Sequence, residues 1–204
     1  ELIDKLIDLA FAEDIGDGDH TTLSCIPATA MGKSKLLIKE AGVLAGIEVA
    51  KEIFNRFDPS MKVEVFINDG TEVKPGDVAM IVEGKVQSLL QTERLMLNVM
   101  QRMSGIATMT RKYARQLEGT HTRVLDTRKT TPGMRILEKM AVKIGGGVNH
   151  RIGLFDMILL KDNHVDFAGG IDKAINRAKD YCKEKGKELK IEIEVRNFDE
   201  LQQV

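Results

Sequence analysis

The sequence of 204 residues contains no tryptophan, two tyrosines and seven phenylalanines, so aromatic side chains make up only 4% of it. This scarcity leaves no broad aromatic platform on which nucleic-acid bases could stack. Ten methionines are present, and we expect a core of methionine and aliphatic side chains. The 30 Lys and Arg residues nearly balance the 31 Asp and Glu residues. This balance excludes a globally basic nucleic-acid-binding protein.

Cysteines and long apolar runs are also scarce. Cys25 and Cys182 are the only cysteines of the sequence, and their spacing fits neither a CxxC pair nor a metal site. We therefore expect reduced thiols and a cytoplasmic location. No apolar run approaches the ~18 residues that a membrane-spanning helix needs. The N-terminal segment is acidic and amphipathic, unlike a signal peptide, so no membrane partner is expected.

Hydrophobic patterning divides the chain into two expected domains, residues 1–105 and 106–204. A long helical stretch over 88–118 would bridge them, with a break or kink at Gly105. The first domain is expected to be α+β, because helical and alternating patterns are mixed in it. Its expected helices are 1–12 and 46–57, and its expected strands are 33–40, 61–67 and 78–82.

From residue 120 onward, strand and helix patterns alternate as in a parallel α/β sheet. The expected strands are 122–126, 157–161 and 191–195, and the expected helices are 132–144 and 170–185. A complete (β/α) barrel takes about 250 residues, so there is room here for fewer than three β/α units. The sequence therefore predicts an α/β fold whose second domain is an incomplete, TIM-like barrel. We expect the chain to be a fragment, truncated before the barrel closes.

Positive charge is concentrated in the segment 123–164, which holds eight Lys or Arg side chains and four Asp or Glu side chains. Such a basic block in an otherwise acidic chain favours a small anionic ligand over a long polyanion. An ordinary alternative applies to Arg135, Lys139 and Lys143, whose spacing of four residues is typical of a solvated helix face.

Polar and charged side chains follow the expected barrel strands, where α/β barrels gather their active groups. These candidates are Thr127, Arg128, Lys129, Lys161 and Glu194, and the glycine-rich loop adds His150 and Arg151. The cations suit a small, multiply anionic substrate, since arginine binds carboxylates and phosphates through paired hydrogen bonds.

Two questions stay open at this point. His150 could be a structural histidine or an anion ligand, and Arg151 beside it favours the ligand. Glu192 and Glu194 share one face of their strand. They indicate either Mg²⁺ or ribose binding, or a salt bridge to Lys161.

Several motifs occur in a characteristic order: EDIGDGDHTT, ERLMLNVMQRMSGIAT, DTRKTTPGMR, EKMAVKIGGGVNHR and LLKDNHV. Together they closely resemble those of the quinolinate phosphoribosyltransferases. The resemblance implies transfer of a phosphoribosyl group from phosphoribosyl pyrophosphate to quinolinate. Decarboxylation would accompany the transfer and give nicotinate mononucleotide, pyrophosphate and CO₂ in NAD biosynthesis, with Mg²⁺ assisting.

The resemblance also implies roles for single residues. Those expected to bind the two carboxylates of quinolinate are Arg94, Arg128, His150 and Arg151. Those expected to serve in catalysis are Lys129, Lys161 and Glu194, with Glu194 near Mg²⁺ and Thr127 as a further substrate contact. The family works as a homodimer or a larger assembly such as a hexamer, and Arg94 would reach the partner's site.

Two alternatives to this activity remain. A paralogue of the same fold could act on another anionic small molecule, or the chain could be a non-catalytic fragment. The family's second acidic residue and its 5′-phosphate loops are missing from these 204 residues, so we do not expect activity from this chain alone.

Overall fold

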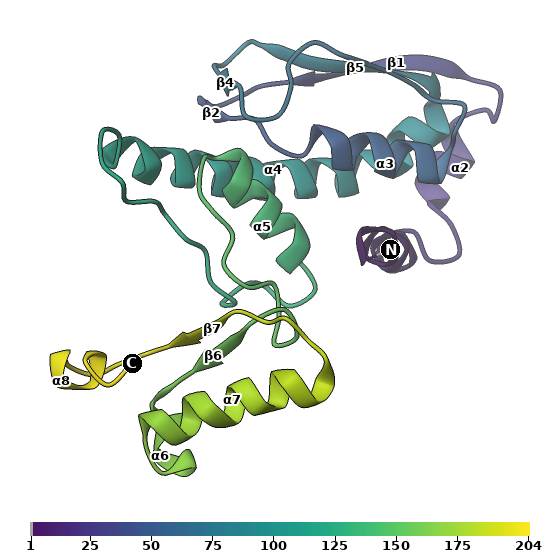
Figure 1. The fold of residues 1–204 in the computed structure, drawn as a ribbon. Helices are drawn as coiled ribbons and strands as arrows, with labels where there is room; N and C mark the ends of the chain where they lie inside the picture. The colour runs from purple at the N-terminus through teal and green to yellow at the C-terminus, as the bar shows by residue number, and fades with distance from the viewer. Residues whose placement is uncertain (1) are drawn as a thin grey trace. The chain divides into compact units, whose positions relative to one another are not determined.

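The computed structural model describes residues 2–204, which fall into two compact units (Figure 1). One unit extends to His150 and the other begins at Arg151. The expected boundary at 105/106 lies inside the first unit, because the helix that contains it packs against the helix that follows residue 134. As a boundary between domains of the whole protein, 105/106 stays a prediction.

The first unit is α+β, as expected. Its helices are α1 (Leu2–Asp14), α2 (His20–Cys25), α3 (Ile47–Phe57), α4 (Val86–Gln116) and α5 (Arg135–Ile144). Its strands are β1 (Met31–Leu37), β2 (Gly42–Val43), β3 (Lys62–Val65), β4 (Glu72–Val73) and β5 (Val78–Lys85). Strand β5 lies between β1 and β3 in an antiparallel sheet, and β2 pairs antiparallel with β4.

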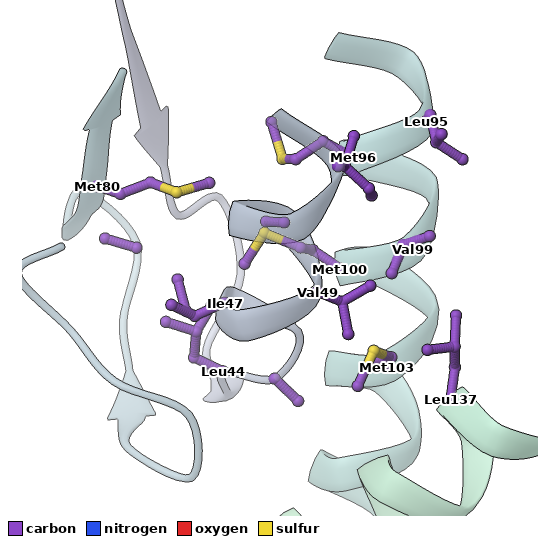
Figure 2. Packing of buried hydrophobic residues seen from close by; sticks show 14 of the residues in the cluster. Leu44, Ile47, Val49, Met80, Leu95, Met96, Val99, Met100, Met103 and Leu137 are labelled. Carbon is purple, nitrogen blue, oxygen red and sulfur yellow. The ribbon is translucent and has the colours of Figure 1, made fainter. Parts of the chain in front are cut away.

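The core of this unit is aliphatic and rich in methionine. Met96, Met100 and Met103 point from α4 towards α3, where Ile47 and Val49 are buried (Figure 2). Because methionine is unbranched and flexible, it can fill the irregular space between these helices. The expected core of methionine and aliphatic side chains is thus confirmed, and Phe54 is a buried aromatic side chain within it.

Helix α4 is continuous through Gly105, so a break there is wrong, whereas a kink at this glycine stays a prediction. Residues on either side of the glycine are fixed by packing, since Met103 and Ala107 are both fully buried. The Ser104 and Thr108 hydroxyls also accept hydrogen bonds from the Ala45 (3.0 Å) and Val43 (2.8 Å) amides. This packing outweighs the roughly 1 kcal/mol helix penalty of one glycine.

The second unit contains β6 (Ile158–Leu160), α6 (Asp162–Ala168), α7 (Ile171–Lys185), β7 (Ile191–Ile193) and α8 (Phe198–Leu201). Strands β6 and β7 pair in parallel, and α6 and α7 connect them (Figure 1). Val165, Ile171 and Ala174 form a small buried cluster with Leu160 and Ile193. The predicted parallel α/β arrangement is confirmed here. None of the described helices is long and apolar enough to cross a membrane.

The strand predicted over 122–126 does not form. Its described residues make one isolated parallel bridge, between Leu125 and Val148. The neighbouring segment turns through Gly145–Gly147 and joins the bridge only at Val148, so it is too short to pair with the whole predicted strand.

The close approach of α5 to α4 at Gly145 predicts a steric effect. A Cβ at Gly145 would lie 2.5 Å from the Ala107 carbonyl oxygen and 2.7 Å from Thr110 Cβ. We expect Gly145→Ala to lower the free energy of unfolding by about 1–3 kcal/mol, measured by urea denaturation of the full-length protein.

Gly105→Ala is the matched control, because a Cβ there meets no atom within 4 Å. This variant is expected to raise the free energy of unfolding by about 0.5–1 kcal/mol, through better helix propensity. Equal stability of the two variants would contradict the packing described for Gly145.

Candidate active site

Two segments of the first unit run side by side and carry several candidate residues. The Val148 amide donates to the Val124 carbonyl (2.8 Å), and the Asp126 amide donates to the Val148 carbonyl (3.2 Å). The His150 amide then donates to Asp126 Oδ1 (2.9 Å). These bonds place the chain that leads to Arg128 next to the chain that ends in His150.

A buried ion pair joins α5 to both segments. Lys139 is only 1% exposed, and its ammonium contacts Asp126 Oδ1. The same ammonium donates to the His150 carbonyl (3.1 Å). The interpretation of Lys139 as part of a solvated face is therefore wrong. A buried lysine needs a charged partner, and Asp126, 13 positions away in sequence, supplies it.

The other two cations of that predicted face differ from each other. Arg135 is half-buried and donates through Nε to the Thr130 hydroxyl (3.0 Å) and through Nη2 to the Arg128 carbonyl (3.4 Å). It therefore supports the loop that carries the candidate residues. Lys143 is exposed, which agrees with the solvated interpretation.

A second ion pair supports the same loop from α4. The Arg102 guanidinium donates to Glu138 Oε1 (2.7 Å) and to the Thr131 hydroxyl (2.9 Å), while the Thr131 amide donates to Glu138 Oε2 (3.3 Å). Burial raises the pKa of Glu138, but hydrogen bonds from Arg102 and Thr131 outweigh it, so the pKa of this carboxyl is lowered. Glu138 therefore acts as a charged anchor.

Arg128 has a feature that points to a ligand. Its side chain is half-buried, and its Nε is buried with no hydrogen-bond partner among the described residues. An unsatisfied buried donor costs free energy, so a partner from outside these residues is expected here. Lys129 beside it is exposed, and the Thr127 hydroxyl accepts a hydrogen bond from the Lys129 amide (3.1 Å).

In the second unit, Lys161 and Glu194 lie together at the ends of β6 and β7. Lys161 Nζ is 2.6 Å from Glu194 Oε1, and both side chains are about half exposed. The salt bridge left open by the sequence is therefore present. Arg151 is half-buried and donates to the Met157 carbonyl (3.4 Å).

The candidate residues thus gather in two groups. Thr127, Arg128, Lys129 and His150 lie on the paired segments of the first unit, and Lys161 and Glu194 meet in the second. Arg94 is exposed on α4, and no hydrogen bond or ion pair among the described residues links it to either group. Residues 2–204, which the structure describes, contain no cluster of three His, Cys, Asp or Glu side chains suited to a metal ion.

Fold and site together define an α/β protein in which arginine and lysine side chains follow paired β segments. Models of the N-terminal and C-terminal domains of quinolinate phosphoribosyl transferase match residues 19–104 and 106–204. The chain therefore belongs to the quinolinate phosphoribosyltransferase family.

Individual relatives agree with this assignment. The chain is 46% identical over 201 residues to quinolinate phosphoribosyltransferase [decarboxylating] 1b of Nicotiana tabacum, covering 98% of this chain and 57% of that protein. It is 42% identical to a probable nicotinate-nucleotide pyrophosphorylase [carboxylating] of Synechocystis, covering 99% and 67%. The chain thus spans little more than half the length of its plant relatives.

Solved structures support the fold. The crystal structure of NadC from Streptococcus pyogenes matches with a TM-score of 0.91 and 39% identity, over 98% of this chain and 70% of that one. The nicotinate-nucleotide pyrophosphorylase from Francisella tularensis matches with a TM-score of 0.89 and 38% identity, over 99% and 70%. The expected α/β fold of two domains is therefore confirmed.

The lowered pKa of Glu138 predicts a pH-dependent contribution to stability. A carboxyl whose pKa falls on folding stabilises the protein above its unfolded pKa, ordinarily 4.5, and loses this effect as pH falls through the folded pKa. We expect Glu138→Gln to cost about 1–2 kcal/mol of unfolding free energy at pH 7. The cost should shrink steadily below about pH 4.5, as measured by denaturation across pH.

Glu93→Gln is the control, because Glu93 is an exposed carboxylate on α4. We expect this variant to match the unsubstituted protein within roughly 0.5 kcal/mol at every pH. A cost for Glu138→Gln that did not vary with pH would contradict the charged role of Glu138.

Proposed function

We propose that the full-length protein transfers a phosphoribosyl group from phosphoribosyl pyrophosphate to the pyridine nitrogen of quinolinate, with loss of CO₂. The products are nicotinate mononucleotide and pyrophosphate, a step of NAD biosynthesis. Membership of the family and the names of the curated relatives support this proposal. The observation that carries it is the buried Nε of Arg128, which has no hydrogen-bond partner within residues 2–204. Arg128 follows the segment that is paired with the segment of His150.

Quinolinate carries two carboxylates on one aromatic ring, and the proposal assigns them to cations. Arg128 would donate its free Nε–H and a terminal N–H to one carboxylate, which is the paired geometry that arginine favours. His150 and Arg151 would complete the binding of the acid, with Arg94 contributed by a partner subunit. Such fixed contacts orient the ring nitrogen for attack.

Lys161 and Glu194 would act on the ribose and the departing groups, together with Lys129. Glycosyl transfer to a ring nitrogen develops positive charge on the ribose, and the Glu194 carboxylate is suited to stabilise it. The Lys161 ammonium, 2.6 Å from Glu194 Oε1, orients that carboxylate. Loss of CO₂ leaves an electron pair on the ring carbon, which the adjacent quaternised nitrogen stabilises before a proton is added.

The proposed cofactor is Mg²⁺. Magnesium is commonly bound by one or two carboxylates together with phosphate oxygens and water, so the half-exposed carboxylate of Glu194 fits as a single protein ligand. When bound, the ion would neutralise negative charge on the pyrophosphate.

We also propose a cytoplasmic homodimer or hexamer. Both cysteines are free thiols, which suits a reducing compartment. Relatives from Nicotiana tabacum and Arabidopsis thaliana are named as mitochondrial and chloroplastic proteins, respectively. Fractionation of the source cells would decide the location of this protein.

The activity is tested by release of CO₂ from carboxyl-labelled quinolinate by the full-length protein. Release should require both quinolinate and phosphoribosyl pyrophosphate. Arg128→Ala should weaken quinolinate binding by about 100-fold, measured by calorimetry, whereas Arg123→Ala, at an exposed position just upstream, should change it little.

Two results would contradict the proposal. If the unsubstituted protein released no CO₂ but used another pyridine acid, the protein would be a paralogue with a different substrate. If Arg128→Ala left quinolinate affinity unchanged, the assigned binding site would be wrong.

The contribution of Arg94 in trans is tested by mixing two inactive variants, Arg94→Ala and Lys161→Ala. In a mixed dimer, one site combines an intact Lys161 with an intact Arg94 from the partner. Random exchange should therefore restore about a quarter of full activity. Mixing Arg128→Ala with Lys161→Ala is the matched control, because both residues would act within one subunit and no activity should return. Failure of the first mixture to recover activity, with exchange verified by mass spectrometry, would contradict the arrangement.

A further inference from the structure

Both main-chain polar groups of His150 are bound by one buried ion pair. The His150 amide donates to Asp126 Oδ1 (2.9 Å), and the His150 carbonyl accepts from Lys139 Nζ (3.1 Å). The Lys139 ammonium also contacts the same Asp126 oxygen. A lysine on α5 and an aspartate on the neighbouring segment thus fix the peptide groups on either side of a candidate ligand.

Asn149 completes this arrangement. Its amide nitrogen, in the orientation that satisfies both neighbours, donates to Asp126 Oδ2 (2.9 Å) and to the Lys139 carbonyl (2.9 Å). Asp126 therefore accepts hydrogen bonds on both carboxylate oxygens. These bonds leave the segment 149–150 little freedom to move relative to Asp126.

Burial makes this ion pair a poor source of stability. The side chains of Lys139 and Asp126 are 1% and 7% exposed, and desolvation of two charges offsets most of their attraction. Apolar residues of similar volume are often as stable at such places. What apolar residues could not supply is the pair of directed hydrogen bonds to His150.

We infer that Asp126 and Lys139 are positioning residues for quinolinate binding, an inference that rests on the proposed function. Asp126 lies two residues before Arg128 in the chain and binds His150 through its carboxylate. The pair therefore sets the separation between the two residues, Arg128 and His150, that are proposed to bind the substrate. Displacement by an ångström would be enough to weaken a two-carboxylate contact.

The test removes the charges without leaving one of them unpaired. In the full-length protein, Asp126→Leu combined with Lys139→Met replaces the pair by apolar side chains, whereas Lys139→Met alone leaves Asp126 buried and unpaired. Lys143→Met, one turn further along α5 at an exposed position, is the matched control. The measurements are thermal stability, hydrogen exchange of the His150 amide, and the dissociation constants of quinolinate and phosphoribosyl pyrophosphate.

The single variant Lys139→Met should be destabilised. The double variant should regain most of the lost stability, yet exchange its His150 amide faster and bind quinolinate about tenfold or more weakly. Its affinity for phosphoribosyl pyrophosphate should stay within roughly twofold, because His150 is assigned to quinolinate. The control should match the unsubstituted protein in every measurement.

A second double variant, with a smaller change at Asp126, is used if the first double variant does not fold. Asp126→Asn with Lys139→Met keeps an oxygen for the His150 amide but loses the bond to the His150 carbonyl. We expect it to fold and to bind quinolinate with an affinity between those of the unsubstituted and apolar proteins. Such partial rescue is not expected if the pair serves stability alone.

Two outcomes overturn the inference: unchanged quinolinate affinity in a stable variant without the pair, or unchanged exchange of the His150 amide. Failure of the proposed function gives a result that differs from both of these outcomes, because the unsubstituted protein itself would then bind no quinolinate. In that case the exchange of the His150 amide would still decide whether the pair positions this residue.

Discussion

The structure around the candidate site depends on one buried contact, between Lys139 of α5 and Asp126. It joins a helix that is packed on the core to two segments that have little regular structure of their own. The single bridge at Leu125 and Val148 could not fix these segments. An ion pair with directed hydrogen bonds can, because each donor and acceptor specifies an angle as well as a distance.

Helix α5 has two different faces, and this explains its place in the fold. Leu137 and Ala141 are fully buried in the core, while polar side chains of the same helix support the loop that follows residue 126. Glu138 accepts a hydrogen bond from Arg102 of α4, and Arg135 donates a hydrogen bond to the Thr130 hydroxyl. The apolar face fixes the helix, and the helix in turn fixes the loop.

Patterns in the sequence predicted those helices and strands that are determined by residues close to one another in the chain. The helix 47–57 and the parallel strands β6 and β7 follow from periodicity within a few residues, and they formed close to the expected positions. The continuous α4 and the missing strand at 122–126 depend on which distant residues pack or pair there, and no pattern near Gly105 or Leu125 carries that information. The interpretation of Lys139 as a solvated side chain is wrong for the same reason, since its partner Asp126 is 13 positions away in the sequence. The Lys161–Glu194 contact could be named beforehand as one of two alternatives, because neighbouring parallel strands bring their ends to one edge.

Charge counting along the sequence overstates the charge available to a ligand. Lys139 is neutralised by Asp126, Arg102 by Glu138, and Lys161 lies against Glu194. These pairs use cations as structural connections, so the number of Lys and Arg residues in the sequence does not measure the strength of an anion site. Arg128 stands apart, because its buried Nε has no partner among the described residues. An anion that binds Arg128 need not break an existing ion pair of the scaffold, which makes this arginine the natural first anchor for a carboxylate.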